Sequence, residues 1–531
     1  MLLKNSMILP MILGMFIVFV LSITMVIATE PLPINEQNAL IKRLLPKPKS
    51  IQLTNGSEVI LDKTLTLQIE LASKNNTETN AEDNAEDNNV KNSAAVIFKQ
   101  YFGTEPIISV SKKDNVPKEK EAYRIRATGK TLTLSAVDFT GIRYAFSTIR
   151  QLAETNHDGE RVTAYWLPEL AIEDAPAMAF RGLHLCWFPE TRFARIEQAL
   201  RLAAYYKFNY VVIEFWGTFP FAQHSEFGWQ EFKAQPENIK RLVHLSKELG
   251  VTIIPQFNIF GHASGARDGT LKHSILDFCP EFQPLFEPDG WVWCLSNPAT
   301  RQVLTDLVLE MYEMFDKPPY FHIGCDEADP PESRRSLRAD YRTLFKDHLL
   351  YFHKLFSERN CRVMMWHDML VSRSDARWKG YAAFGNQDTA GLAEELPKDI
   401  VICDWQYGSG KEKEETWETM RYFKKLGFTV LACPWENAKG MRSIGKTVTD
   451  AQLDGMLCTT WHHLNKATMH VIFSVGGQVT WCTSPDYPGV WRRVFGTHLR
   501  QIGWDMRIRD YRDTGHTDLQ VPPETIQDVP R

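Results

Sequence analysis

The sequence lacks the patterns that mark several common functional classes. It contains no CxxC pair and no HExxH, so a zinc ribbon, a CxxC redox motif and the zinc-binding helix of many metalloproteases are not indicated. No GxGxxG follows the first strand of the repeating region that begins at Phe180, which disfavours a dinucleotide-binding sheet. The formal net charge is only −5, so neither nucleic acid nor an anionic membrane surface is expected as a partner.

Long apolar runs are almost absent as well. The exception is the uncharged run from Met7 to Ala28, which follows Lys4 and approaches the roughly 20 residues that span a bilayer. Two alternatives stay open, a cleaved signal peptide and an N-terminal membrane anchor, because the residues around Ala28 form a poor cleavage site. We expect residues 1–30 to be this targeting segment and the protein to be exported, secreted or periplasmic.

The nine cysteines are poorly arranged for a disulfide framework. Most of them lie in or at the end of apolar, strand-like runs, where Cys acts as a small hydrophobic residue. Only Cys279 and Cys294, in a segment of loop composition, are placed to pair. A Cys279–Cys294 disulfide is therefore an expectation.

The chain is long enough for two domains and has the composition of a folded protein, with 531 residues, 44% hydrophobic and 24% charged. Residues 40–174 show short strand-like runs and a helix, which predicts a small α/β N-terminal domain. Within it, residues 74–92 contain the polar near-repeat AEDNAEDN, which predicts a disordered acidic insertion. Residues 506–531 are expected to be an extended C-terminal tail.

Residues 175–505 repeat a strand, a loop and a helix. Eight strand-like runs can be counted: 180–187, 208–216, 251–257, 320–324, 362–366, 400–405, 428–434 and 455–461. Mostly apolar strands alternating with helices predict an α/β fold with a closed parallel β-barrel. We expect this (β/α)8 TIM barrel to be the catalytic domain. An open doubly wound sheet is the alternative, and the missing glycine motif disfavours it.

Chemistry in such barrels lies at the C-terminal ends of the strands. Here most of these ends carry Trp, several of them next to a carboxylate or His. The rim residues are Glu214, Asn258, His262, Asp326, Glu327, Trp366, Trp405, Trp435, Trp461 and His463. Indole faces stack on the CH faces of a pyranose while polar side chains bind its hydroxyls, so this rim suits a sugar.

The segment PPYFHIGCDEADPPESRR, residues 318–335, places two adjacent acids at the end of the fourth strand. A two-carboxylate glycosidase needs its acids about 5 Å or more apart, across the sugar ring. Neighbouring side chains in an extended backbone point different ways, so Asp326 and Glu327 fit that scheme poorly. They suit a substrate that brings its own nucleophile, such as a 2-acetamido group. One alternative is a helix-capping acidic loop. A second is a metal site, which is disfavoured because His322 and Asp326 do not share a face.

HIGCDEAD resembles the His-x-Gly-Gly-Asp-Glu motif of family 20 glycoside hydrolases, the β-N-acetylhexosaminidases, with Cys325 in place of the second Gly. FRGLHL, which contains Arg181, is similar to the opening strand of that family, and PQFNIFGHASG is similar to its third-strand segment. YRIRATGKTLTLSAVDFTGIRYAFSTIRQL resembles its small N-terminal domain. The resemblance covers roughly residues 40–480.

The resemblance implies a role for each site residue. Glu327 would be the general acid and then the base, and Asp326 would orient the acetamido nitrogen and stabilise an oxazolinium-like intermediate. The remaining roles are sugar binding for Arg181, His262, Trp366, Trp405, Trp435, Trp461 and His463, and support for His322, Glu214 and Asn258. The chain departs from the family pattern at Cys186, where members usually have Asp, at Asn258, where they have an acid, and at His463, where they have Glu.

Two functions of different classes follow. The first is an exo-acting retaining hydrolase that removes terminal β-linked N-acetylglucosamine or N-acetylgalactosamine by substrate-assisted catalysis, with no metal or organic cofactor. Its partner would be a glycan or glycoconjugate that contains N-acetylhexosamine. The second is a noncatalytic carbohydrate-binding protein on the same barrel, which the altered hydroxyl-binding positions suggest.

Overall fold

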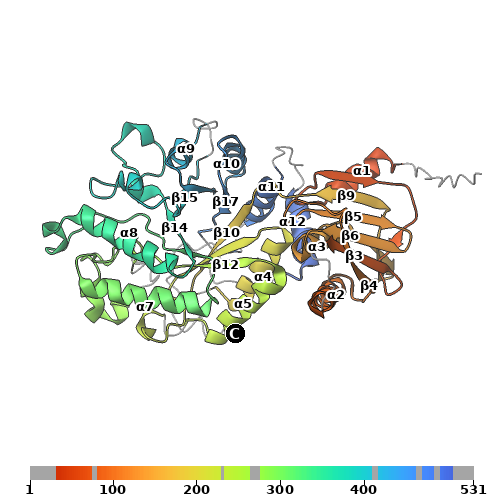
Figure 1. The fold of residues 1–531 in the computed structure, drawn as a ribbon, viewed down its shortest axis with the longest axis horizontal. Coiled ribbons are helices and arrows are strands. Elements are labelled where there is room, and N and C mark those ends of the chain that lie inside the picture. Colours follow the sequence, from red (N-terminus) through yellow and green to blue (C-terminus); the bar gives the residue numbers. More distant parts are fainter. Residues whose placement is uncertain are drawn as a thin grey trace, which may run out of the picture.

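The computed structural model has two lobes, a barrel and a smaller α/β lobe (Figure 1). The described residues are 31–73, 81–189, 191–228, 232–263, 275–408, 416–461, 464, 469–482 and 491–505. The expected targeting segment, residues 1–30, and the expected tail, residues 506–531, lie outside the described residues. Within the described part of the chain, no helix is long and apolar enough to cross a membrane.

The small lobe is built on a six-stranded sheet of order β1-β9-β5-β6-β3-β4. The bounds of these strands are β1 (Ser50–Leu53), β3 (Thr66–Ala72), β4 (Ile107–Lys113), β5 (Tyr123–Thr128), β6 (Thr131–Ala136) and β9 (Leu170–Asp174). A second sheet joins β2 (Val59–Ile60), β8 (Arg161–Leu167) and β7 (Glu154–Asp158). Buried and exposed residues alternate along β3 and β5, so one face of the larger sheet forms the core.

Helices α2 (Ala81–Phe102) and α3 (Phe139–Leu152) pack against that buried face. The prediction of a disordered insertion over residues 74–92 is therefore wrong from Ala81 onward, while residues 74–80 lie outside the described residues. The reason is a buried stripe at every fourth residue, Val90, Ala94, Phe98 and Phe102. This stripe is the apolar face of a helix whose first two turns are polar.

The predicted eight-stranded parallel barrel is confirmed, in the order β10 to β17. Its strands are β10 (Phe180–Trp187), β11 (Tyr210–Phe215), β12 (Thr252–Gln256), β13 (Tyr320–His322), β14 (Arg362–Trp366), β15 (Val401–Trp405), β16 (Thr429–Cys433) and β17 (Gly455–Cys458). Each strand lies inside the run from which it was predicted. The open doubly wound alternative is excluded, because β17 pairs with β10 and closes the sheet.

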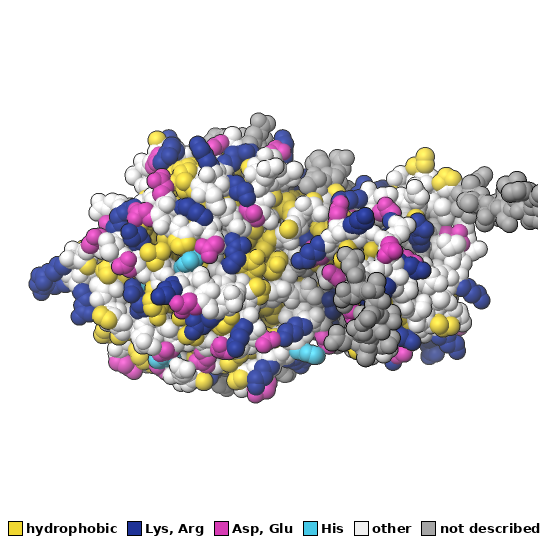
Figure 2. Space-filling view, viewed as in Figure 1, with side chains coloured by type: hydrophobic (Ala, Val, Ile, Leu, Met, Phe, Trp, Pro, Cys, Tyr) yellow, Lys and Arg dark blue, Asp and Glu magenta, His cyan; other side chains and the backbone are white. Residues whose placement is uncertain are grey.

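Helices surround the barrel and connect most of its strands (Figure 1). Their bounds are α4 (Phe193–Tyr205), α5 (Pro236–Leu249), α6 (Ile275–Phe278), α7 (Pro298–Met314), α8 (Tyr341–Ser357), α9 (Glu418–Lys425), α10 (Ala438–Asp450), α11 (Gly476–Trp481) and α12 (Trp491–Gln501). A short helix, α1 (Ile34–Ile41), precedes the small lobe. Lys and Arg are interspersed with Asp and Glu over the face shown in Figure 2, as the small net charge requires.

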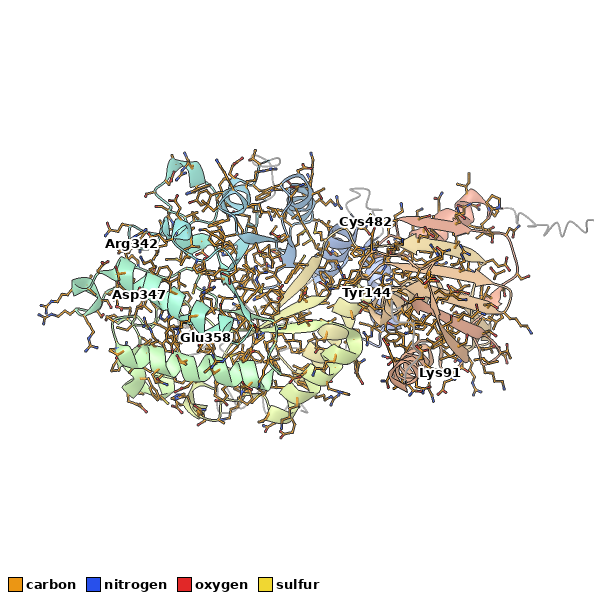
Figure 3. The ribbon with its side chains drawn as sticks, viewed as in Figure 1. Lys91, Tyr144, Arg342, Asp347, Glu358 and Cys482 are labelled. Atoms are coloured by element: carbon orange, nitrogen blue, oxygen red, sulfur yellow. The ribbon has the colours of Figure 1, made fainter. Side chains whose placement is uncertain are left out.

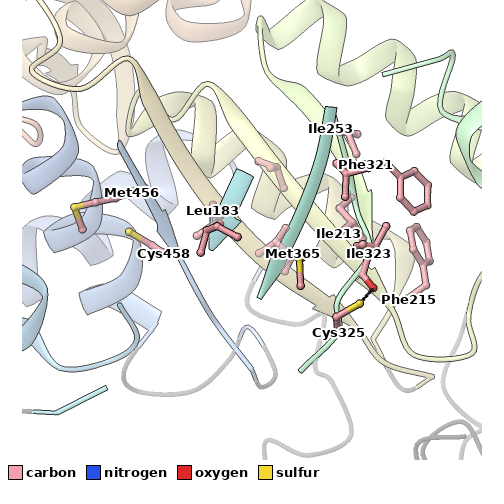
Figure 4. Close-up of a cluster of buried hydrophobic side chains, with 14 of the residues drawn as sticks. Leu183, Ile213, Phe215, Ile253, Phe321, Ile323, Cys325, Met365, Met456 and Cys458 are labelled. Atoms are coloured by element: carbon pink, nitrogen blue, oxygen red, sulfur yellow. Dashed lines mark hydrogen bonds between the residues drawn. The ribbon is translucent and has the colours of Figure 1, made fainter. Parts of the chain in front are cut away.

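Strand alternation separates two sets of barrel side chains. Leu183, Ile213 and Phe321 point outward into the layer between strands and helices, where Figure 4 shows part of that cluster. Residues an odd number of positions away on the same strand, such as Phe180 and Val212, point inward and form a separate cluster in the lumen. The alternation along each strand therefore determines which side chains point into the lumen and can reach the C-terminal end of the barrel.

Arg181 lies in the junction between the lobes and not at the sugar-binding rim. It is fully buried, and its guanidinium donates to Glu121 Oε2 (2.9 Å), to the Met178 carbonyl (2.8 Å) and to the Tyr144 hydroxyl (3.0 Å). Tyr144 on α3 lies between the two lobes in Figure 3. The predicted sugar contact is wrong because Arg181 is an outward residue at the N-terminal end of β10, opposite to the catalytic end.

The expected Cys279–Cys294 disulfide is also wrong, since both cysteines are free thiols. Cys294 is buried, and its Sγ contacts the hydroxyls of Ser296 (3.3 Å) and Ser336 (3.8 Å). Cys279 is partly exposed and precedes a short 3-10 helix. The loop composition of this segment was a poor guide, because the Cys294 thiol is buried against Ser hydroxyls instead of facing Cys279.

Candidate active site

The acids lie in a tight loop directly after β13. Gly324 (φ 66°), Cys325 (φ 74°) and Glu327 (φ 47°) all have positive φ, a region that costs non-glycine residues about 1–3 kcal/mol and is frequent at functional sites. Close packing of a second loop holds this conformation, since a Cβ on Gly261 would lie 2.0 Å from the Asp326 carbonyl oxygen. The Cys325 thiol turns away from the site and donates to the Ile323 carbonyl at 3.5 Å (Figure 4).

His262 brings the two acids together. Its Nε2 lies 3.3 Å from Asp326 Oδ2 and 3.6 Å from Glu327 Oε2, and its own backbone has a φ of 55°. The Asp326 side chain is 7% exposed and the Glu327 side chain is 30% exposed. One imidazole thus spans a buried carboxylate and a partly exposed one, while the predicted contact of His262 with sugar stays a prediction.

Burial and charge set the protonation of this group. Burial by itself lowers the pKa of His262, but the combined effect of Asp326, Glu327 and Glu214 outweighs it and raises the pKa to about 10. Burial raises the pKa of Asp326, and the positive charge of His262 opposes the rise. His262 is therefore protonated at neutral pH and places a positive charge beside both acids.

Asp368, which follows β14, positions Glu327 from the other side. Its Oδ2 accepts the backbone N–H of Glu327 (2.9 Å), and its Oδ1 accepts the indole N–H of Trp405 (3.2 Å). Burial, reinforced by the negative charge of Asp326, raises the pKa of Asp368 well above its ordinary value. Its sequence signal was the strand end Trp-His-Asp, to which no role was assigned.

Aromatic side chains from β15, β16 and β17 form one wall. Tyr407 links them, with its ring 5.0 Å from Trp405 in a stacked arrangement and 5.3 Å from Trp435, while its hydroxyl accepts the Trp461 indole N–H at 2.5 Å. All four side chains are partly exposed. Tyr407 lies only two residues beyond Trp405, but it stands in the loop after β15, where no strand-end pattern in the sequence indicates it.

Trp366 forms the floor of this wall and has no exposed face. It is fully buried, and its ring centroid lies 5.3 Å from that of Trp461 and 4.3 Å from that of His322. The expected direct sugar contact of Trp366 is therefore replaced by support of Trp461. His322 Nδ1 accepts the backbone N–H of Gly324 (3.1 Å), so His322 braces the turn that leads to the acids.

The buried Glu214 pairs with the partly exposed Asn258 near the ends of β11 and β12. Asn258 Nδ2 donates to Glu214 Oε1 at 3.0 Å. The other Glu214 oxygen contacts His184 and Cys186, and the ligand atoms of these three residues lie within 4.8 Å of one another. His463, which was expected to bind sugar, lies outside the described residues.

A cavity of about 690 Å³ opens beside Glu327. It is lined by the loop after β13, including Asp329, and by the loop after β14, including Arg373, Phe384 and Asn386. Arg373 lies over the Phe384 ring, 4.3 Å from its centroid. Glu327 thus borders a space large enough for a bound group, and the Phe384 ring in its lining lies 5.8 Å from the Trp405 ring of the aromatic wall.

Both parts of the chain match models of one family. Residues 42–175 match glycosyl hydrolase family 20, domain 2, and residues 229–464 match the glycosyl hydrolase family 20 catalytic domain. The aligned region therefore includes both lobes and the acid pair.

Curated relatives and solved structures point the same way. A beta-hexosaminidase of Vibrio furnissii is 24% identical over 414 residues, which are 68% of this chain and 59% of the relative. A beta-N-acetylhexosaminidase of Cellulomonas fimi is 23% identical over 306 residues, 54% of this chain and 59% of the relative. The chain thus spans under two thirds of the length of either.

Among solved structures, the fold resembles that of the family 20 β-N-acetylhexosaminidase from Streptomyces coelicolor A3(2), with a TM-score of 0.63 and 13% identity over 93% of this chain and 100% of that one. It also resembles the family 20 exo β-N-acetylglucosaminidase from Vibrio harveyi, with a TM-score of 0.63 and 15% identity over 87% and 77% of the two chains. These likenesses support the fold, and the family models settle the membership. The chain belongs to glycoside hydrolase family 20, as a divergent member.

Proposed function

We propose that the protein is an exo-acting retaining glycoside hydrolase that removes terminal β-linked N-acetylhexosamine from glycans or glycoconjugates. The observation that carries the proposal is the state of Asp326. Its Oδ2 faces His262, whereas its Oδ1 is buried and has no hydrogen-bond partner among the described residues. A buried carboxylate oxygen without a partner is costly, and an acetamido N–H from the substrate would satisfy it.

The first step would break the glycosidic bond. Glu327, which borders the cavity, donates its proton to the leaving oxygen while the acetamido carbonyl oxygen of the substrate forms a bond to C1. The electron pair of the C1–O bond leaves with the departing alcohol. The resulting oxazolinium carries a positive charge, and Asp326 accepts its N–H and offsets that charge.

The second step would return the enzyme to its starting state. Glu327, now a carboxylate, takes a proton from water as the water oxygen attacks C1. The bond between C1 and the acetamido oxygen breaks, and its electron pair restores the amide. Two inversions at C1 give net retention of configuration.

Glu327→Gln tests the acid in this scheme. We expect kcat on 4-nitrophenyl N-acetyl-β-glucosaminide to fall by about 10²–10⁴, since the amide cannot transfer a proton. The matched control is Glu332→Gln, because the Glu332 side chain is exposed on the same loop. If the wild type binds the sugar but does not hydrolyse it, the proposed hydrolase activity is contradicted and the noncatalytic carbohydrate-binding alternative is favoured.

We also propose that residues 1–30 direct export, because they contain the apolar run Met7–Ala28. Fractionation of cells that express the chain with and without residues 1–30 tests this. Equal cytoplasmic retention of both forms would contradict it.

A further inference from the structure

Three residues with metal-ligating side chains meet in the upper lumen of the barrel. His184 and Cys186 are two positions apart on β10 and therefore share its inward face. The parallel register of β10 and β11 pairs Cys186 directly with Glu214. All three residues are buried, with exposures of 0%, 1% and 4%. The fold thus places an imidazole, a thiol and a carboxylate at one point.

Two of the three distances between these ligand atoms match those around a tetrahedral zinc ion. His184 Nε2 lies 3.2 Å from Glu214 Oε2, and Cys186 Sγ lies 3.7 Å from the same oxygen. Zinc bonds of about 2.3 Å to sulfur and about 2.0–2.2 Å to nitrogen and oxygen give tetrahedral edges of roughly 3.3–3.7 Å. The third pair, His184 and Cys186, lies within 4.8 Å, so the three atoms are close enough to share one ion after a shift of the side chains.

The chemistry of the ligands selects the metal. Mg²⁺ and Ca²⁺ prefer oxygen ligands alone, whereas a mixed set of sulfur, nitrogen and oxygen suits Zn²⁺. A thiolate and a carboxylate together carry two negative charges, which a divalent cation balances in this buried place. When the metal binds, the Cys186 thiol loses its proton to solvent and the sulfur lone pair forms the bond to zinc.

Neighbouring side chains hold the ligands in place. Asn258 Nδ2 donates to Glu214 Oε1 (3.0 Å), and Asn258 Oδ1 accepts from Gln256 Nε2 (3.1 Å). This chain of hydrogen bonds fixes the carboxylate with Oε2 toward His184 and Cys186. The His184 ring packs at 4.5 Å from the Trp461 ring centroid. Such outer contacts orient ligands in metal sites.

We propose that His184 Nε2, Cys186 Sγ and Glu214 Oε2 bind one zinc ion, with water as the fourth ligand. The site uses neither Asp326 nor Glu327, so this proposal can be tested independently of the proposed hydrolase activity. The competing interpretation is a hydrogen-bonded trio in which Glu214 accepts from both neighbours.

Metal content of the full-length protein tests the site. We expect one zinc per chain by atomic spectrometry after dialysis against zinc and gel filtration. Loading with Co²⁺ should give the thiolate-to-cobalt charge-transfer band of a tetrahedral site. Folded wild-type protein that retains no stoichiometric metal would overturn the proposal and leave the hydrogen-bonded trio.

Variants identify the ligands. Cys186→Ser should lose the charge-transfer band and bind Zn²⁺ at least tenfold more weakly, and Glu214→Gln, of nearly the same shape, should also weaken binding at least tenfold. The control is Cys361→Ser, since the Cys361 thiol is buried at the opposite end of the barrel, next to the start of β14. A charge-transfer band that survives in Cys186→Ser and disappears in Cys361→Ser would overturn the assignment. Circular dichroism of each variant separates loss of metal from loss of fold.

Discussion

At the scale of single residues, His262 determines how the acid pair works. One protonated imidazole contacts Asp326 at 3.3 Å and Glu327 at 3.6 Å, and the loop that carries the acids is held in a left-handed conformation. In the proposed mechanism this arrangement keeps Asp326 in reach of the substrate amide, while Glu327 borders the cavity. The pair can then divide its roles although its members are adjacent in the chain.

The raised pKa of His262 predicts a pH-dependent contribution to stability. The pKa rises from 6.5 to about 10 on folding, so proton binding favours the folded state. This contribution is complete below pH 6.5 and is lost as the pH rises through 10. The difference in unfolding free energy between wild type and His262→Gln, measured in urea, should shrink across that window. A difference that grows with pH would contradict the ion pair.

Asp368 predicts a positioning effect on catalysis. Both of its oxygens accept N–H groups, so Asp368→Asn turns one acceptor into a donor and disturbs the Glu327 backbone. We expect kcat to fall about tenfold or more with a smaller change in KM. Asp399→Asn is the control, because Asp399 is exposed at the opposite end of the barrel. A change confined to KM would show that Asp368 acts on substrate binding instead.

The two acids could be predicted from the sequence, but the residues that contact and position them could not. Asp326 and Glu327 could be predicted because an acidic pair at the end of an apolar strand is a local signal. Asp368 and Tyr407 could not, since each acts through contacts that exist only when different strand ends converge. Arg181 was misplaced because a motif match carries no information about which end or face of its strand a residue occupies.

At the scale of elements, inward and outward alternation explains most of the barrel. The short apolar runs predicted where the strands lie but not which side chains point inward, because both faces of these strands are buried, and the helix α2 was not predicted at all. Its first half is polar and low in complexity, and its buried stripe begins only at Val90. Tertiary packing on the sheet supplies the stability that the polar half lacks.

Helix α2 predicts a large cost for a core truncation. Phe98 is fully buried against the small-lobe sheet, so Phe98→Ala should destabilise the lobe by about 3–5 kcal/mol. Lys91→Ala is the matched control, since Lys91 is exposed on the same helix (Figure 3). The check is urea unfolding followed by circular dichroism. Equal stability of the two variants would contradict the packing of α2 against the small-lobe sheet.

At the scale of the whole molecule, a buried ionic network joins the lobes. Arg181 pairs with Glu121, and Lys207 Nζ contacts Asp174 Oδ2 at 3.1 Å, both in places closed to water. Asp174 also accepts the indole N–H of Trp481 at 2.9 Å. Strands of the small lobe are thus tied to the N-terminal end of the barrel, far from the acids.

This junction predicts a stability effect without a loss of chemistry. Glu121→Ala leaves the buried Arg181 charge uncompensated, which should cost about 3–5 kcal/mol and lower the melting temperature. Glu119→Ala is the control, since the Glu119 side chain is 69% exposed. Differential scanning calorimetry checks the loss of stability, and activity measured at low temperature checks that the chemistry is unchanged. An unchanged melting temperature in Glu121→Ala would contradict the role of the network.

The central claim is that the substrate supplies the nucleophile, and one comparison in the wild-type protein tests it most directly. The measurement is kcat/KM for 4-nitrophenyl N-acetyl-β-glucosaminide against that for 4-nitrophenyl β-glucoside, which lacks the acetamido group. The account predicts a ratio of about 10³ or more, because the internal nucleophile contributes a high effective molarity. Comparable turnover of the two glycosides would contradict it.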